Sequence, residues 1–564
     1  MKRVPAAGTL LALAASVLVI GTTSSAAAQS RSQGRSMVIT RYGIVAAESP
    51  LAAQAGAQIL VHGGNAVDAI VATNAVMGVV EPMMNGMGGD LFAIVYDAKT
   101  GRLYGLNASG WSPAALTPAF LAAHGIDKMP LYGIDSVTVP GAVDGWTQLL
   151  QRFGRLSLRT DLQPAIRYAR EGFPVPEWDA MYWADAEPFL AKNPATGRLY
   201  LIGGHAPTVG QVFRNPDLAR SLTLVANGGR DAFYRGPLAR KILALEESEG
   251  GAMTAADLAG FHSQWVTPLS ATYHGWTVYE LPPNGQGIAA LEMLNLMSHF
   301  PLAQYGHNSA NALHVMIEAK KLAYADLARY IGDPRFSHIP VAGLLSPAYA
   351  QQRAKLIDMQ RASCSVAAGQ PPSGDTTYLT AVDAQGNMVS LIQSNFEEFG
   401  SRLVPPGAGF VLQDRGALFN LDPGSPDVLA GHKRPLHTII PGFMTHGSTR
   451  IAFGIMGGFN QAQAHAQFVS NVVDFGMNIQ AALEAARFTK MDFSGCDVMM
   501  EDRIPAEVRA ALEARGHQIR VVGDYASVMG GGQAVERDFS TGVNFGASDP
   551  RKDGEAIPEP LPPQ

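Results

Sequence analysis

Apolar residues follow a helical spacing in some parts of the chain and an alternating spacing in others. From residue 51 to residue 80 the chain is rich in alanine at helical spacing, with a break at residues 63–64. This pattern predicts two buried helices that meet at a turn. A glycine-rich turn at residues 85–90 precedes a predicted strand at 91–96, and a second turn leads into a strand at 103–106. A first β-rich block is therefore expected near the beginning of the chain.

A second β-rich block begins at Thr376. Its predicted strands cover residues 378–382, 388–393, 410–413 and 451–455, and a helix is expected at about 462–475. The stretch between the two blocks alternates helical patterns with proline and glycine. Two β-rich blocks separated by helices favour a layered α/β assembly over a doubly wound parallel sheet.

Three further segments differ in composition from the rest of the chain. Lys2 and Arg3 precede an apolar stretch at residues 10–20 and small residues that end at Ala28, an order typical of a secretory signal peptide at 1–28. The apolar stretch is shorter than the ~20 residues that span a bilayer, so we expect an exported, most simply periplasmic, protein without a membrane anchor. Residues 362–375 are small, polar and rich in proline and glycine, which predicts a surface linker, and residues 557–564 are expected to form an unstructured tail.

The overall composition is that of a packed, turn-rich protein. The chain has 564 residues, 47% of them hydrophobic, which suits a large composite fold and argues against disorder. Its formal net charge is −6, and no run of Lys and Arg is interleaved with aromatic residues, so nucleic acid is not expected as a partner. Cys364 and Cys496 are the only cysteines. Export would permit a bridge between them, but their separation along the sequence favours two unpaired cysteines.

The junction between the linker and the second β-rich block carries the candidate chemistry. If the backbone breaks between Asp375 and Thr376, one residue gains a β-hydroxyl nucleophile and a free α-amine. That amine has an unperturbed pKa near 8, so it can accept the hydroxyl proton and act as general base. Taken alone, the two threonines are far more typical of an ordinary strand start.

Ordered motifs along nearly the whole mature chain resemble the gamma-glutamyltransferase family of N-terminal-nucleophile hydrolases. The matching segments lie at residues 59–69, 86–89, 139–145, 163–173, 282–287, 318–326, 374–387, 433–435, 457–458 and 546–551. Their order and number are far more specific than any single motif.

The resemblance implies an αββα sandwich made of a large subunit, 29–375, and a small subunit, 376–564, which together form a heterodimer. Thr376 would attack the carbonyl of a small-molecule amide or peptide and form an acyl-enzyme, which water or an acceptor amine resolves. Ser394 matches the position that supports the nucleophile. Gly457 and Gly458 match the backbone N–H pair that holds the oxyanion, where small residues allow a close approach. No cofactor is implied.

The substrate pocket departs from the glutamyl-selective pattern of that family. No arginine is present at residues 107–113, where one would pair with the α-carboxylate, and Phe396 and Leu418 replace an Asn and an Asp. Arg415 replaces a glutamine, and His437 and Thr438 replace two serines. These changes remove a partner for an ammonium group and add a guanidinium that binds carboxylates bidentately. The resemblance implies a hydrolase or acyltransferase that acts on γ-glutamyl (glutathione-type) amides or on a related carboxylate-bearing acyl amide. The changes in the pocket point to the alternative, an acyl group with a carboxylate but no α-amine, as in the oxamate amidohydrolase or glutaryl-type cephalosporin acylase branch.

Other readings of the sequence explain less. Export and a two-part α/β build also suit a periplasmic binding protein, but self-cleavage would serve no purpose there. The glycines at 86–89 have the spacing of neither a P-loop nor a dinucleotide fingerprint. The histidines His432, His437, His446 and His465 lack metal-ligand spacing, so no metal site is predicted from them.

Overall fold

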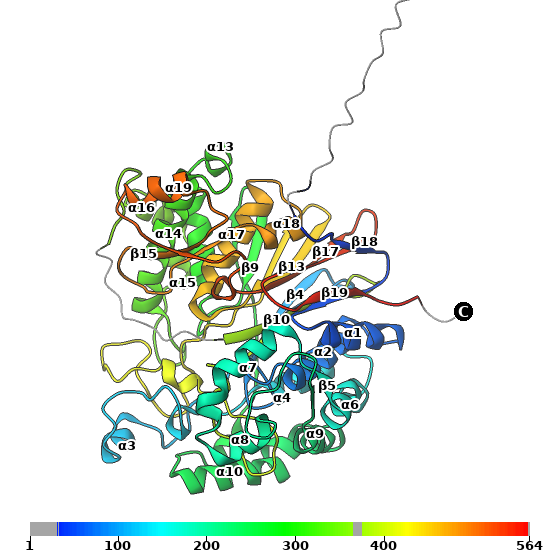
Figure 1. Cartoon of the computed structure of the whole chain (residues 1–564). Helices are drawn as coiled ribbons and strands as arrows, with labels where there is room; N and C mark the ends of the chain where they lie inside the picture. The colour runs from blue at the N-terminus through cyan, green and yellow to red at the C-terminus, as the bar shows by residue number, and fades with distance from the viewer. Residues whose placement is uncertain (1–30, 32, 365–374, 562–564) are drawn as a thin grey trace, which may run out of the picture.

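The computed structural model describes residues 31, 33–364 and 375–561. The predicted signal peptide at 1–28 and most of the predicted linker therefore lie outside the described residues. Two seven-stranded sheets pack face to face, and helices cover the outer face of each sheet (Figure 1). Every strand pair within these two sheets is antiparallel. This is the αββα sandwich that the sequence predicted.

The first of the two sheets, here called the nucleophile sheet, contains Thr376. Its strand order is β19 (Glu555–Pro558), β2 (Ile44–Ala47), β10 (Asp375–Val382), β11 (Met388–Phe396), β3 (Asp90–Asp97), β4 (Arg102–Ala108) and β7 (Gln264–Val266). The second sheet runs β1 (Val38–Thr40), β18 (Val543–Ser548), β17 (Gly532–Asp538), β13 (Thr449–Ile455), β12 (Gly442–His446), β9 (Trp276–Glu280) and β8 (Leu269–Tyr273). Residues before and after position 375 therefore contribute strands to both sheets.

The strands of the nucleophile sheet are buried on both faces. In β10, Leu379 and Ala381 pack into the core under one helical layer, whereas Tyr378 and Val382 belong to the core between the sheets. Because side chains alternate along a strand, each strand can serve two apolar layers at once. The result is a central core between the sheets and one outer core on each side.

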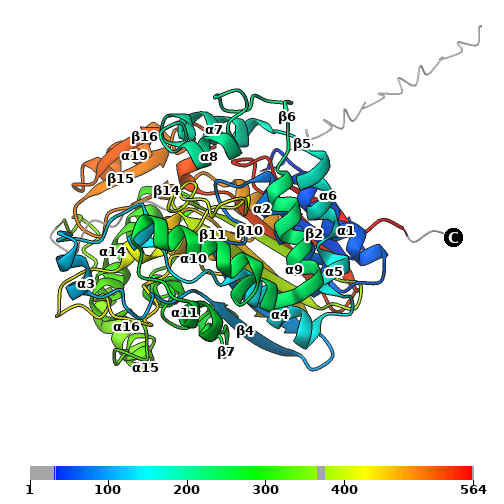
Figure 2. The same ribbon diagram turned by 90° about the horizontal axis from the view of Figure 1, so that it is seen from below.

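Helices of the first half of the chain cover the nucleophile sheet. They include α1 (Pro50–Val61), α2 (Ala66–Val80), α4 (Ala142–Phe153), α6 (Gln163–Glu171), α9 (Pro216–Tyr234) and α10 (Pro237–Glu249), several of which Figure 2 shows from below. The other layer contains α12 (Gly287–Met297), α14 (Ala310–Tyr330) and α17 (Gln461–Val473). The turn between α1 and α2 lies where the sequence predicted it. Gly63 has a φ of +94°, and the Asn65 side chain caps α2 by accepting bonds from two backbone amides.

Three expectations were wrong. Residues 410–413 form no strand, because their amides bond to loop carbonyls outside any strand ladder, as Gln413 does to Gly88. Residues 557–558 belong to strand β19, where Ile557 pairs with Val45, so the chain end is not a free tail there. Cys364 and Cys496 form a disulfide, whereas two unpaired cysteines were expected.

No helix among the described residues is long and apolar enough to cross a membrane.

Candidate active site

Thr376 lies at an irregularity between two central strands of the nucleophile sheet. Asp375 pairs with Phe396 and Thr377 pairs with Gln393, so two residues of β11, Ser394 and Asn395, stand opposite Thr376 alone. Such a bulge re-aims side chains and is common next to active sites. The Thr376 side chain is buried in this uncleaved chain. The amide group of Gln461 donates to the Thr376 Oγ1 at 3.4 Å.

The same glutamine connects Thr376 with the predicted oxyanion glycines. Gly457 and Gly458 follow strand β13 with φ angles of +121° and +56°, and Gln461 begins helix α17 directly after this turn. These φ values belong to the region that favours glycine, so the turn presents its backbone without a side chain in the way. The Gln286 amide fixes the turn from behind by donating to the carbonyl oxygens of Gly458, at 2.8 Å, and Thr438, at 2.6 Å.

Three of the predicted site residues form one hydrogen-bonded group. The Arg415 guanidinium donates to the Ser394 Oγ at 2.9 Å and to the Thr438 Oγ1 at 2.6 Å. Because Ser394 belongs to the bulge opposite Thr376, this group places Arg415 beside the proposed nucleophile. The structure thus brings together residues that lie up to 62 positions apart in the small-subunit sequence, from Thr376 to Thr438.

Arg415 is a fully buried cation without an ion-pair partner among the described residues. Its Nε has no hydrogen-bond partner, and the Phe396 ring lies 4.4 Å from its guanidinium carbon. Burial lowers the pKa of Arg415 to about 10, while the charges of Asp90, Asp414 and Glu397 act in the opposite direction. The group therefore remains charged at neutral pH. A buried charge is costly unless it is paired, so an anionic ligand would complete this site.

His437 faces a carboxylate of the protein. Its Nε2 lies 2.8 Å from the Asp90 Oδ2, both side chains are fully buried, and its ring packs on Phe92. Its Nδ1 accepts a bond from the Ile439 amide, which fixes the proton on Nε2. Burial lowers the pKa of His437 to about 4, with the charge of Arg415 adding to the effect and Asp90 opposing it. The neutral ring therefore contacts Asp90 and Phe92 without supplying a positive charge.

Sequence reasoning did not assign roles to Asp90, Gln286 and Gln461. Asp90 follows the glycine-rich turn and also accepts bonds from the Gly110 amide at 2.8 Å and the Gln413 side chain at 2.9 Å. All three lie inside or directly beside motifs that carried the family resemblance. A buried polar side chain next to a glycine turn was the available signal, but its partners come from distant parts of the chain.

Buried carboxyl groups lie next to β10 just beyond the nucleophile. The Glu48 Oε1 accepts a bond from the Tyr378 amide at 2.9 Å, and the Lys552 ammonium lies 3.8 Å from the other oxygen of Glu48. Burial raises the pKa of Glu81 to about 7, although Lys552 acts against this effect. Burial likewise raises the pKa of Asp179 well above its ordinary value. These shifts favour the neutral form of the carboxyl groups, which reduces the repulsion among several acids that lie near one lysine.

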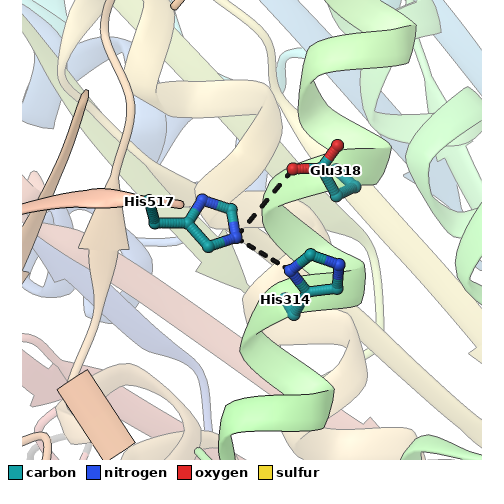
Figure 3. Close-up of side chains that lie close together, drawn as sticks. All are labelled: His314, Glu318 and His517. Carbon is teal, nitrogen blue, oxygen red and sulfur yellow. Dashed lines mark hydrogen bonds and ion pairs between the residues drawn. The ribbon is translucent and has the colours of Figure 1, made fainter. Parts of the chain in front are cut away.

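One grouping of metal-ligand side chains occurs among the described residues, and the sequence had not singled it out. Donor atoms of His314, Glu318 and His517 lie within 4.8 Å of one another (Figure 3). Lys321 already places its ammonium 2.7 Å from the Glu318 Oε1, so the protein's own cation neutralises this carboxylate. The donor set fits a hydrogen-bonded cluster better than a metal centre.

The sandwich, with a buried threonine on a central strand and a glycine turn beside it, defines a hydrolase of the N-terminal-nucleophile class. A family model described as gamma-glutamyltranspeptidase matches residues 52–559. The chain belongs to the gamma-glutamyltranspeptidase family.

The similar proteins differ in the reactions that their names describe. The glutathione hydrolase-like YwrD proenzyme of Bacillus subtilis is 38% identical, over 90% of this chain and 96% of that protein. The oxamate amidohydrolase proenzyme of Klebsiella pneumoniae is 34% identical, over 92% of this chain and 98% of that protein. The crystal structure of a cephalosporin acylase from Bacillus halodurans has a TM-score of 0.86 at 41% identity and covers 96% of this chain and 99% of that one. The chain is thus an enzyme of proenzyme type, and the binding-protein alternative is not favoured.

Proposed function

We propose that the chain cuts itself between Asp375 and Thr376 and then hydrolyses amides of a carboxylate-bearing acyl group that lacks an α-amine, such as a glutaryl group. The unpaired guanidinium of Arg415 beside Ser394 carries this proposal. Similarity to an oxamate amidohydrolase and a cephalosporin acylase supports it.

The scission would follow from the position of Thr376. Its Oγ attacks the carbonyl carbon of Asp375, and the C–N bond breaks as the nitrogen takes up a proton. The ester that results is opened by water, which leaves a carboxylate on Asp375 and a free amine on Thr376. The products would be a large subunit, 29–375, and a small subunit, 376–564, held together as a heterodimer.

The mature reaction would use the same hydroxyl. The Thr376 amine accepts the hydroxyl proton as Oγ attacks the substrate carbonyl, and the amides of Gly457 and Gly458 stabilise the oxyanion. The amine product leaves with that proton, and water then attacks the acyl ester. A neutral Gln461 contacts the hydroxyl, so the new amine is the base that this mechanism requires.

The pocket would select the acyl group through its charge. A carboxylate can form two parallel bonds with the Arg415 fork, next to the Ser394 and Thr438 hydroxyls. Leu418 offers no acceptor for an α-ammonium group. A γ-glutamyl donor would therefore bury an unpaired positive charge, whereas a glutaryl donor would not.

The proposed processing is tested by substitution at two neighbouring threonines. Thr376→Ala is expected to leave one uncut chain without activity, whereas Thr377→Ala, which removes an equally buried hydroxyl, is expected to be cut. Intact-mass analysis of both proteins gives the result. An active wild-type preparation without any fragment that begins at Thr376 would contradict the mechanism.

The proposed acyl specificity is tested with paired anilides. We expect kcat/KM for glutaryl anilide to exceed that for γ-glutamyl anilide, and a clear preference for the γ-glutamyl compound would refute the pocket assignment. Oxamate and glutathione are tested as further substrates in the same assay.

We also propose export to the periplasm, on the strength of the N-terminal sequence pattern at 1–28. Cell fractionation and sequencing of the mature large subunit test this proposal. A mature chain that begins near residue 29 is expected, and a cytoplasmic protein that retains Met1 would contradict it.

A further inference from the structure

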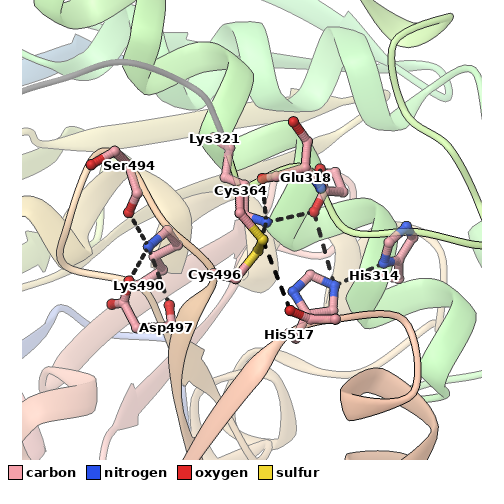
Figure 4. The surroundings of a disulfide bond; sticks show 11 residues. His314, Glu318, Lys321, Cys364, Lys490, Ser494, Cys496, Asp497 and His517 are labelled. Carbon is pink, nitrogen blue, oxygen red and sulfur yellow. Dashed lines mark hydrogen bonds and ion pairs between the residues drawn. A yellow bond between two sulfur atoms is a disulfide. The ribbon is translucent and has the colours of Figure 1, made fainter.

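The disulfide connects two parts of the chain that the proposed scission would separate. Cys364 precedes the Asp375–Thr376 bond and Cys496 follows it, with 132 positions between the two cysteines. Cys496 lies directly before strand β15 (Asp497–Glu501), which pairs with β16 (Gln518–Val522). Figure 4 shows the bridge between Cys364 of the predicted large subunit and Cys496 of the predicted small subunit, next to Glu318 and Lys321 of helix α14.

Residues on either side of Cys364 make further contacts across the same boundary. The Ala362 amide donates to the Arg515 carbonyl at 2.7 Å, which fixes the large-subunit backbone on the small subunit two residues before the disulfide. The Cys364 sulfur lies 3.9 Å from the Gly516 carbonyl oxygen. The large subunit is therefore anchored at the bridge by backbone as well as by sulfur.

The buried polar cluster beside the disulfide also spans this boundary. His314 of α14 meets His517 of the small subunit with 2.8 Å between their ring nitrogens (Figure 3). Lys321 of α14 contacts the Glu318 carboxylate, the Ser363 carbonyl at 3.0 Å and the Cys496 sulfur at 3.7 Å. This network packs the two cysteine-bearing segments against one helix, and Cys496 is only 4% exposed.

We propose that the Cys364–Cys496 disulfide is a covalent tether between the large and small subunits of the mature enzyme. The proposal rests on the scission proposed above. Formation of the bond removes two electrons and two protons from the thiols, and an oxidising disulfide of the exported compartment accepts them. Scission then breaks the backbone between the cysteines, and the S–S bond becomes the covalent connection between the two products.

The tether matters when the enzyme unfolds. Without it, cut subunits separate on denaturation and must meet again by diffusion. With it, both remain in one molecule, so their reassociation is intramolecular and independent of protein concentration. The bond would also keep Cys364 of the large subunit at the small subunit after the cut.

Denaturing electrophoresis of the mature protein, with and without reductant, tests the tether. We expect one band of the combined size without reductant and two bands with it. Cys364→Ser and Cys496→Ser are each expected to give two bands under both conditions, while both remain cut and active. Two wild-type bands without reductant, or two titratable thiols in denaturant, would overturn the proposal.

Thiol titration of the uncut Thr376→Ala protein separates this proposal from the one on which it rests. No titratable thiol is expected in the denatured variant, because the bond does not require scission. Two thiols there overturn the tether but leave self-cleavage intact. A wild-type chain that stays whole after reduction overturns self-cleavage, and with it the tether, even when no thiol is found.

Discussion

At the scale of single residues, Arg415 is the side chain on which the proposed choice of substrate depends most. Its charge is buried, its fork touches two hydroxyls, and its Nε lacks a partner. Nearby carboxyl groups and these two hydroxyls offset part of the cost of burying that charge, and a bound anion would offset more of it, so the same contact would contribute to both affinity and specificity.

Two substitutions of Arg415 should separate the effect of its positive charge on substrate binding from the effect of its planar guanidinium group. We expect Arg415→Gln to lower kcat/KM for glutaryl anilide by about 30- to 1,000-fold, because truncating one partner of a buried charged pair costs about 2–4 kcal/mol. Arg415→Lys retains the charge but loses the planar guanidinium, so its kcat/KM for glutaryl anilide should lie between that of the wild type and that of Arg415→Gln. Steady-state kinetics measures this, with acetyl anilide as a substrate that lacks the carboxylate. An equal loss for both substrates would point to a general structural defect.

A neighbouring carboxyl group should make anion binding depend on pH. Burial raises the pKa of Asp414 to about 7, against the lowering effects of the Glu397 amide and the Arg415 charge. Above that pH, a negative charge stands beside Arg415 and opposes a bound carboxylate. The inhibition constant of glutarate should therefore rise by roughly tenfold between pH 5.5 and 8.5.

Asp414→Asn is the matched control for this pH effect. His437, with a pKa of about 4, stays neutral across the range and does not contribute. The variant should bind glutarate with a weaker pH dependence than the wild type. Equal pH profiles for the two proteins would exclude Asp414 as the titrating group.

The sequence singled out Ser394, Arg415 and Thr438, which the structure brings into one hydrogen-bonded group, while their roles and that of Thr376 stay predictions. It was not sufficient for Asp90 or Gln461, whose partners lie far away along the chain. The Asp90–His437 contact joins residues 347 positions apart. Pairing of Cys364 with Cys496 was missed for the same reason, since the two cysteines lie 132 positions apart and only the folded chain brings them together.

At the scale of elements, the glycine turn after β13 combines an unusual backbone with the proposed oxyanion site. Gly457 has φ +121° and ψ 47°, and an added Cβ would lie 3.4 Å from the Asn460 side chain. We expect Gly457→Ala to shift this turn and to lower kcat by about 100-fold, comparable to the loss of one oxyanion donor. Steady-state kinetics with saturating glutaryl anilide measures the effect.

Gly447 provides the control for backbone strain alone. It lies in the hairpin between β12 and β13 with a φ of +51°, and an added Cβ would have no neighbour within 4 Å. Gly447→Ala should cost about 1–2 kcal/mol of stability and leave kcat unchanged. If Gly457→Ala and Gly447→Ala each lose kcat in proportion to their loss of melting temperature, the turn at Gly457 has no special catalytic role.

Most elements could be predicted because they are apolar runs of helix or strand length that end at turn residues, as in α1, α2, β3 and β11. Residues 410–413 are also apolar, yet they form no strand, and the Leu412 and Gln413 amides bond to the carbonyls of Leu403 and Gly88. Ile557 looked like part of a proline-rich tail, but an edge position in the sheet tolerates the following proline. Local pattern does not reveal which segment finds a free sheet edge.

At the scale of the whole molecule, the predicted subunits are interleaved rather than adjacent. In the nucleophile sheet, β10 and β11 of the small subunit lie between β2 and β3 of the large subunit. Both sheets contain strands from both parts, so separating the subunits would break two sheets and open all the cores.

Reduction alone should therefore not separate the native subunits. We expect the mature enzyme in reductant to elute from gel filtration as one species that contains both subunits, and Cys496→Ser to elute in the same way. The reason is that the sheets, not the disulfide, hold the native form together. Separate elution of the subunits without denaturant would contradict the interleaved arrangement.

The position of Thr376 on a central strand also sets the order of events during maturation. Strand β10 pairs with β2 on one side and β11 on the other, and only this pairing creates the bulge that aims the hydroxyl. A chain that has not closed its sheet has no attacking geometry and stays whole. The proposed cut would therefore follow the closing of the nucleophile sheet, so a fragment that begins at Thr376 would come only from chains that had already paired β10 with β11.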